Sequence, residues 1–127
     1  MRVIVVRHAE AAPGEPDELR PLTAAGRENA RVLAGRLRGK RVDAVLSSPL
    51  LRARETAEPI ARALGVEAES DERLAPGATA DDIRDAVAGR GAAVVVVGHQ
   101  PDCGLAVLAL TGRELPFPPG GTAEVEL

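Results

Sequence analysis

The stretch Val3-Ile4-Val5-Val6-Arg7-His8-Ala9-Glu10 decides how the rest of the chain is interpreted. Its run of apolar residues, almost all valine, predicts a strand that is buried on both faces of a sheet. The polar pair Arg7-His8 follows at the point where this strand ends. Because ligands of open α/β sheets bind at the carboxyl ends of the strands, the pair is expected at the edge where chemistry takes place.

A second apolar run ends in the same way. Val94 to Val97 is followed by Gly98 and His99, and the chain contains only 2 histidines. An Arg-His pair after one strand is, taken alone, typical of a solvated strand end. Two buried strands that each lead into one of the only two histidines form a more specific pattern.

Composition limits the classes of function. The chain has 127 residues, a formal net charge of −3, no Trp or Tyr and one Phe. This balance argues against nucleic acid as a partner, because it offers neither a basic face nor aromatic stacking platforms. No apolar run is long enough to span a membrane, and no secretory signal is recognisable. The single cysteine, Cys103, is expected to be a packing residue, and it predicts a reducing, cytoplasmic location.

Apolar patterns and turn residues predict alternating strands and helices with short connections. Strands are expected at 3–6, 42–46, 66–70, 94–97 and 122–127, and helices at 23–39, 49–64, 79–87 and 101–112. The last strand alternates apolar and polar residues, so it is expected at or near a sheet edge. The pattern predicts a single domain over 1–127: a three-layer α/β/α sandwich with a mostly parallel central sheet.

Helix ends and faces can also be predicted. Thr23 and Thr79 are expected to be N-caps, and Ser48 is expected to cap the second helix with Pro49 at its first position. In the last helix, Leu105, Leu108 and Ala109 are expected to face the core. The acidic residues of the loop at 11–18 are expected to be merely solvated.

Arg7, His8, Arg52 and His99 lie at predicted strand ends and at a helix start, so all four are expected to meet at one edge of the sheet. Two guanidiniums and two imidazoles without an obligatory acid make an anion pocket, and guanidinium forks match the oxygens of phosphate. A neutral imidazole can be the nucleophile of a covalent phosphoryl intermediate. No cluster of zinc-type ligands is recognisable. A carboxylate magnesium site built from the acidic residues of the loop has little support, so neither a metal nor a cofactor is expected.

Several short motifs in order strengthen this interpretation. They are Arg7-His8-Ala9, Pro21-Leu22-Thr23, Ser47-Ser48-Pro49-Leu50-Leu51-Arg52-Ala53 with Glu55-Thr56-Ala57, Leu74-Ala75-Pro76-Gly77 and Gly98-His99-Gln100-Pro101. Together they resemble the histidine phosphatase superfamily over nearly the whole chain. The short length and the last two motifs are most similar to its small branch, the SixA-type phosphohistidine phosphatases.

The resemblance implies roles for these residues. His8 would be the nucleophile, Arg7, Arg52 and His99 would hold the phosphoryl oxygens, and water would hydrolyse phospho-His8 without a metal. Ala9 stands where many members have glycine. Members that cleave phosphate esters carry a general acid near 71–77, where Asp71 and Glu72 are the candidates. An imidazole leaves phosphorus more easily than an alkoxide does. A missing general acid would therefore favour substrates with a P–N bond.

Two residues are weaker candidates for substrate binding. Arg20 could reach the pocket or guide an acidic partner, and Gln100 could offer its backbone N–H to phosphate. The expected substrate is phosphohistidine on a protein, such as a histidine phosphotransfer or phosphocarrier protein. Two alternatives stay open: a small-molecule phosphomonoesterase and a phospho-ligand binding module without turnover.

Overall fold

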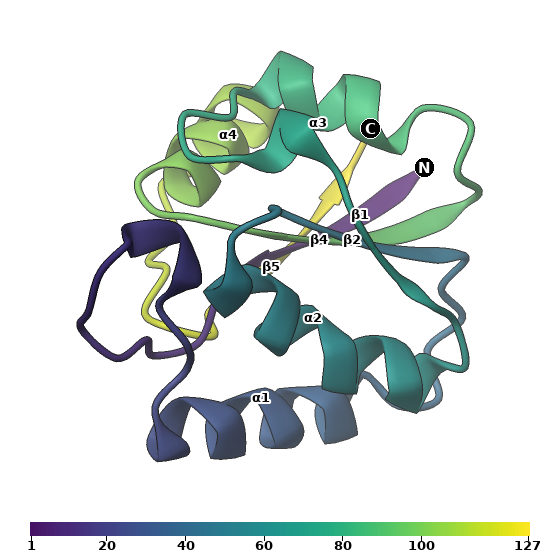
Figure 1. Cartoon of the computed structure of the whole chain (residues 1–127). Helices are drawn as coiled ribbons and strands as arrows, with labels where there is room; N and C mark the ends of the chain where they lie inside the picture. The colour runs from purple at the N-terminus through teal and green to yellow at the C-terminus, as the bar shows by residue number, and fades with distance from the viewer.

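The computed structural model describes all 127 residues as a five-stranded sheet between two pairs of helices (Figure 1). The sheet order is β3-β2-β4-β1-β5. The strands are β1 (Arg2–Arg7), β2 (Ala44–Ser47), β3 (Ala68–Ser70), β4 (Ala93–Gly98) and β5 (Thr122–Glu126). The helices are α1 (Ala24–Leu37), α2 (Leu51–Leu64), α3 (Ala80–Val87) and α4 (Asp102–Thr111), with short 3-10 turns at Asp17–Leu19 and Glu72–Leu74.

The sheet is mostly parallel, as the sequence predicts. Strands β1, β2, β3 and β4 run parallel to their neighbours, and only β5 pairs antiparallel with β1. Strand β5 lies at one edge, and its residues alternate between buried and exposed. One face of the sheet is covered by α1 and α2 and the other by α3 and α4 (Figure 1). The predicted three-layer α/β/α fold is therefore confirmed.

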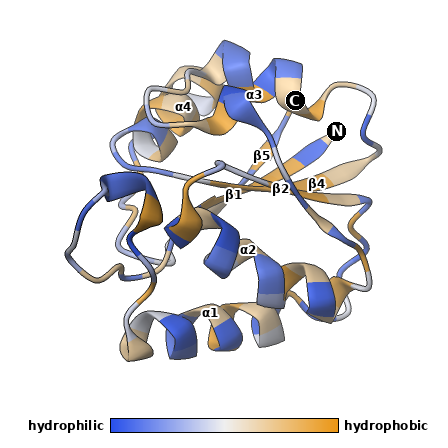
Figure 2. Ribbon diagram, viewed as in Figure 1, coloured by the Kyte–Doolittle hydropathy of each residue, from blue (hydrophilic) through white to orange (hydrophobic).

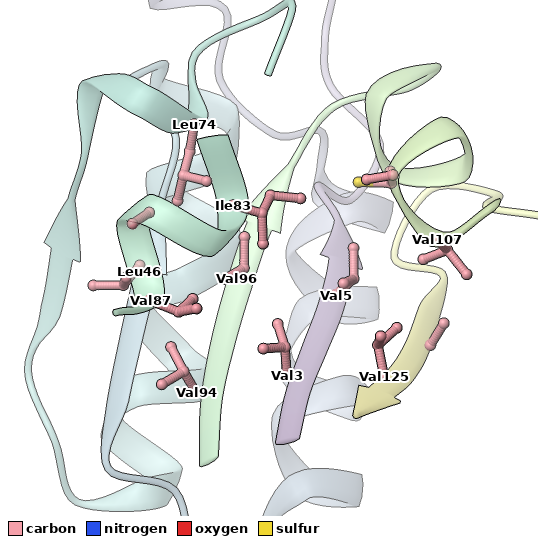
Figure 3. Packing of buried hydrophobic residues seen from close by; sticks show 14 of the residues in the cluster. Val3, Val5, Leu46, Leu74, Ile83, Val87, Val94, Val96, Val107 and Val125 are labelled. Carbon is pink, nitrogen blue, oxygen red and sulfur yellow. The ribbon is translucent and has the colours of Figure 1, made fainter. Parts of the chain in front are cut away.

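Alternate valines of the central strands fill two separate cores. Val3, Val5, Val94 and Val96 pack under α3 and α4 together with residues such as Ile83 (Figure 3). The alternate residues of the same strands point to the opposite face of the sheet and pack against α1 and α2. They are Ile4, Val6, Val95 and Val97. Figure 2 shows the apolar residues concentrated along the strands, with hydrophilic residues distributed over the helices. An unbroken apolar run is what a strand buried on both faces requires.

The prediction for the face of α4 was wrong. Leu105 and Leu108 are 60% and 41% exposed, and Ala109 is exposed as well, whereas Cys103 and Val107 are buried. Nearly every residue of this helix is apolar, so periodicity cannot distinguish an inner face from an outer one. The position of the helix on the sheet determines which face is buried.

Cys103 is a buried packing residue, as predicted, and burial raises the pKa of its thiol to about 12.

Helix starts follow the sequence with one exception. Thr23 accepts a hydrogen bond from the Gly26 amide, and Thr79 forms a capping box with Asp82, as expected of N-caps. However, α2 begins at Leu51, two residues later than predicted, and no side chain caps it.

No helix of the structure has the length and apolar character needed to cross a lipid bilayer.

Candidate active site

The register of the central strands brings the two histidines together. Arg7 of β1 is paired with Gly98 of β4, and the amide of His8 donates to the carbonyl of Gly98 at 3.0 Å. The next residue on each chain segment is a histidine, so both rings leave the sheet at the same edge. Their ring centroids lie 5.3 Å apart. His8 and His99 are far apart in the sequence, and the parallel pairing of β1 with β4 explains why they meet.

The hydrogen bonds of His8 define its tautomer. Its Nδ1 lies 2.7 Å from the carbonyl oxygen of Ala9. A carbonyl can only accept, so Nδ1 carries the proton and Nε2 keeps its lone pair. Burial lowers the pKa of His8 most strongly, and the positive charges of Arg52, Arg7 and Arg20 lower it further. His8 is therefore a neutral imidazole at neutral pH, with Nε2 available as a nucleophile.

His99 is buried and rests against Ser48. Its Nε2 lies 2.7 Å from the Ser48 hydroxyl, which also accepts a hydrogen bond from the Leu50 amide at 3.2 Å. Burial lowers the pKa of His99 most strongly, and the proximity of the His8 ring and of the Arg52 guanidinium opposes a positive charge on it further, so the pKa of His99 is about 4. Ser48 was predicted to cap the following helix. Instead it directly follows β2, its amide donates to the carbonyl of Val97, and its hydroxyl supports the histidine that follows β4.

Arg7 presents an unpaired donor at this edge. One of its terminal nitrogens donates to the carbonyl of Phe117 at 3.0 Å, while its Nε is buried and has no hydrogen-bond partner. A buried donor without a partner is costly, since it loses its bonds to water and gains none in return. An anion bound at this edge would satisfy the group.

Arg52, unlike the half-buried Arg7, is a buried arginine. It lies in the first turn of α2, and its two terminal nitrogens donate to the backbone carbonyl of Asp17 at 2.9 Å and to its carboxylate at 3.2 Å. Asp17 belongs to the loop whose acidic residues were predicted to be merely solvated, and for Asp17 that prediction was wrong. A guanidinium has five N–H donors, so three remain for another ligand.

Arg20 and Gln100 lie at the margins of this group. Arg20 donates from Nε to the carbonyl of Ala12 at 2.8 Å and pairs with the Asp17 carboxylate at 3.1 Å. The positive charge of Arg20 contributes to the lowered pKa of His8, so Arg20 influences the site electrostatically. The Gln100 side chain is exposed and accepts from the Gly104 amide at 2.7 Å in the first turn of α4.

The two acidic residues proposed as general acids differ in their surroundings. The Asp71 carboxylate accepts hydrogen bonds from three nitrogens of Arg73, at 2.7 to 3.0 Å. These bonds lower the pKa of Asp71, so it stays ionised at neutral pH. Glu72 is exposed. Both follow β3, which is separated from β1 by β2 and β4.

Thr56 anchors the segment that leaves β1, and sequence reasoning gave it no role. Its hydroxyl donates to the Arg52 carbonyl at 2.8 Å and accepts from the amide of the fully buried Ala9 at 3.0 Å. The carboxylate of Glu55 likewise accepts from the Leu22 amide at 2.7 Å. Both residues lie in the motif Glu55-Thr56-Ala57, so the motif was the signal, but its contact with Ala9 depends on the fold.

These groups make a strongly electropositive edge. Two guanidiniums surround two neutral imidazoles, one of which has a free nitrogen lone pair. A hollow of about 590 Å³ lies elsewhere, between α1 and α2, and its lining includes neither histidine. The fold and this anion-attracting edge of the sheet fit a site that binds and transfers a phosphoryl group.

Comparison with known proteins agrees with such a site. Residues 3–76 match the histidine phosphatase superfamily (branch 1). The chain is 33% identical over 125 residues to phosphohistidine phosphatase SixA of Escherichia coli, covering 91% of this chain and 78% of that protein. The structure of the protein histidine phosphatase SixA complexed with tungstate matches with a TM-score of 0.87 and 32% identity, over 100% of this chain and 88% of the other.

A further relative has no function in its name. An uncharacterized protein of Picosynechococcus is 40% identical over 114 residues, covering 82% of this chain and 69% of that protein. The chain belongs to the histidine phosphatase superfamily, in its SixA-type branch.

Proposed function

We propose that this phosphatase hydrolyses phosphohistidine on a protein, through a covalent phospho-His8 intermediate. The observation that carries the proposal is the state of His8: a neutral ring whose Nδ1 is held by Ala9 and whose Nε2 is free, beside two guanidiniums. A binding module would need the cations but would have no use for an oriented nucleophile.

In the first step, Nε2 of His8 attacks the phosphorus atom in line with the leaving nitrogen. A P–N bond to His8 forms while the P–N bond to the substrate breaks, and its electron pair returns to the substrate imidazole. Arg7 and Arg52 donate to the equatorial oxygens, where negative charge is held during transfer. The unpaired Nε of Arg7 supports this role, because a phosphoryl oxygen would satisfy it.

His99 supplies a third donor in this scheme. The Ser48 hydroxyl donates its proton to Nε2 of His99, so that Nδ1 carries the ring proton and can donate to the phosphoryl group. In the second step, water attacks phospho-His8, and inorganic phosphate and the free imidazole are released. The scheme needs no metal, and His8 is neutral again at the end.

A phosphoramidate substrate is supported by the state of Asp71. An alkoxide leaving group requires a proton in the transition state, and the Arg73-bound Asp71 carboxylate is held ionised. A phosphorylated imidazole leaves without such a donor when its second nitrogen already carries a proton. The relatives named as phosphohistidine phosphatases support the same substrate class. The partner would then be a histidine phosphotransfer or phosphocarrier protein.

A paired hydrolysis assay tests the proposal. Wild type and His8→Ala would each receive a phosphohistidine protein and an aryl phosphate ester, with a chelator present and no added metal. We expect strong turnover of the P–N substrate, weak turnover of the ester, and loss of both together with the phosphoenzyme in His8→Ala. Equal activity of the two proteins would contradict the mechanism.

Preference for the ester would instead favour a small-molecule phosphomonoesterase. In that case Glu72→Gln and Asp71→Asn should slow ester hydrolysis, most strongly for poor leaving groups, because one of them would have to be the general acid. Stoichiometric phosphate binding without turnover of either substrate would favour a binding module.

A further inference from the structure

Asp17 is the one acidic side chain bound to the clamp, the pair of arginines Arg7 and Arg52 proposed to hold phosphate, and it binds Arg52. Its carboxylate bridges two guanidiniums, with 3.2 Å to Arg52 and 3.1 Å to Arg20, and its backbone carbonyl accepts a second bond from Arg52. It belongs to a 3-10 turn of the loop that leaves β1, and this loop lies beside the start of α2 (Figure 1). A residue of a long surface loop is thereby tied to the site.

Asp17 lies on the solvent side of the clamp. The Arg52 side chain is 9% exposed, whereas that of Asp17 is 62% exposed. Its negative charge nevertheless reaches the site, since it counteracts the lowering of the pKa of His99. The carboxylate is therefore bound to a residue of the site and open to a bound partner at the same time.

The chemical state of Asp17 defines what it can do there. Hydrogen bonds from Arg20 and Arg52 hold the pKa of its carboxyl below the usual value. It is ionised at neutral pH and accepts hydrogen bonds, but it has no proton to donate. Each carboxylate oxygen has one guanidinium partner, so lone pairs remain for a further donor.

The proposed reaction also defines where the leaving group lies. In-line transfer places it on the side of the phosphorus atom opposite Nε2 of His8, which is where the partner protein must be bound. A phosphorylated histidine ring in this place presents one nitrogen to phosphorus. Its second nitrogen carries an N–H in the reactive form.

We propose that Asp17 is a specificity-determining residue whose carboxylate accepts a hydrogen bond from the second ring nitrogen of the departing imidazole. The inference rests on the proposed function. The P–N bond breaks, its electron pair returns to the ring, and the proton stays on the second nitrogen, so that neutral imidazole leaves. Asp17 takes no proton. It stabilises the protonated phospho-imidazole, which is the form that leaves readily.

The same carboxylate would act against ester substrates. An alkoxide or phenolate has no N–H to donate and gains negative charge as it leaves, next to an ionised carboxylate. Like charges repel, so the ionised carboxylate would oppose the departure of an anion. One residue would thus favour P–N cleavage and disfavour P–O cleavage.

The test compares selectivity rather than activity alone. Wild type, Asp17→Asn and Glu18→Gln would be assayed with a phosphohistidine peptide and with 4-nitrophenyl phosphate. Glu18 is the matched control, because it is the neighbouring exposed acid of the same turn and takes part in no hydrogen bond of the structure. We expect the ratio of kcat/KM for the peptide to that for the ester to fall about tenfold or more in Asp17→Asn only.

Other outcomes would overturn the inference. An equal loss on both substrates would mean that Asp17 only positions Arg52. An equal gain on both, with tighter binding of inorganic phosphate, would mean that it competes with the phosphoryl group for Arg52. A matching change of the ratio in Glu18→Gln would mean that the effect comes only from the change in net charge. A phosphoenzyme on His8 with an unchanged ratio would overturn this inference alone, whereas no P–N turnover by wild type would overturn the proposed function with it.

Discussion

The Ser48 hydroxyl orients His99 and is itself held by a backbone amide. It accepts from the Leu50 amide and lies 2.7 Å from Nε2 of His99, where its own proton is the donor in the proposed scheme. A ring that is held by one nitrogen presents the other in a defined tautomer. The site thus depends on a residue that carries no charge and performs no chemistry.

Replacing this hydroxyl should disturb His99 without unfolding the chain. We predict that Ser48→Ala lowers kcat about tenfold, because one orienting hydrogen bond is lost. Nitrogen NMR of the His99 ring should show a changed tautomer. Ser47→Ala is the matched control: its hydroxyl is buried too, but it donates to the Ser48 carbonyl at 2.9 Å. Similar kcat values for the two variants would contradict the role of Ser48.

Helix α2 connects the site to the scaffold through its inner face. Within one turn it carries Arg52, whose guanidinium lies at the site, and Thr56, whose hydroxyl holds the Ala9 amide. Because Ala9 in turn accepts from Nδ1 of His8, the helix determines the direction of the nucleophile through a short series of bonds. Packing of α2 on the sheet and orientation of His8 are therefore coupled.

Thr56→Val keeps the shape of this side chain and removes its hydroxyl. The buried Ala9 amide would lose its partner, so we predict a loss of about 1–3 kcal/mol in the free energy of unfolding, measured by urea denaturation. Thr111→Val is the control, since Thr111 also donates to the carbonyl four residues earlier but is exposed at the end of α4. It should lose about 0.5 kcal/mol or less. Equal losses would show that Thr56 has no special contact.

The elements also show where sequence patterns fail. Leu105 and Leu108 were expected in the core because they are large and apolar, but the helix that carries them is apolar on all sides. Ser48 before Pro49 has the features of a helix start, yet its hydroxyl contacts His99, which follows another strand. In both cases a local pattern allows two solutions, and contacts between distant segments select one.

The complete chain should gain stability from an oxyanion at the site. The unpaired Arg7 donor and the remaining donors of Arg52 favour such a ligand, and a ligand that binds only the folded state stabilises it. At a tungstate concentration one hundred times its Kd, this gain is about 2.7 kcal/mol, enough to raise Tm by several degrees.

Two arginines on one helix provide the comparison. Arg52→Lys should lose most of the Tm increase, because an ammonium cannot reproduce the guanidinium fork. Arg54→Lys should keep it, since Arg54 is exposed on the same helix. Thermal unfolding with and without tungstate measures both. An absent Tm increase in wild type, or an equal increase in the two variants, would contradict an anion site at Arg52.

The linear sequence was sufficient for the architecture and for the group of four residues at the sheet edge. Unbroken valine runs can only be buried on both faces, and parallel strands place the residues that follow them at a common edge. Arg7, His8, Arg52 and His99 could therefore be selected from strand ends and a helix start, although their catalytic roles stay a prediction.

Folding in three dimensions was needed for everything that supports or modifies this group. The bonds of Ser48 to His99, Thr56 to Ala9 and Asp17 to Arg52 join segments 35 to 51 residues apart. A hydroxyl or carboxylate has no periodic signature, and its partner depends on which strand lies next to which. The same holds for the outer face of α4. Burial on a sheet can be read from composition, whereas the identity of a polar partner depends on the packing.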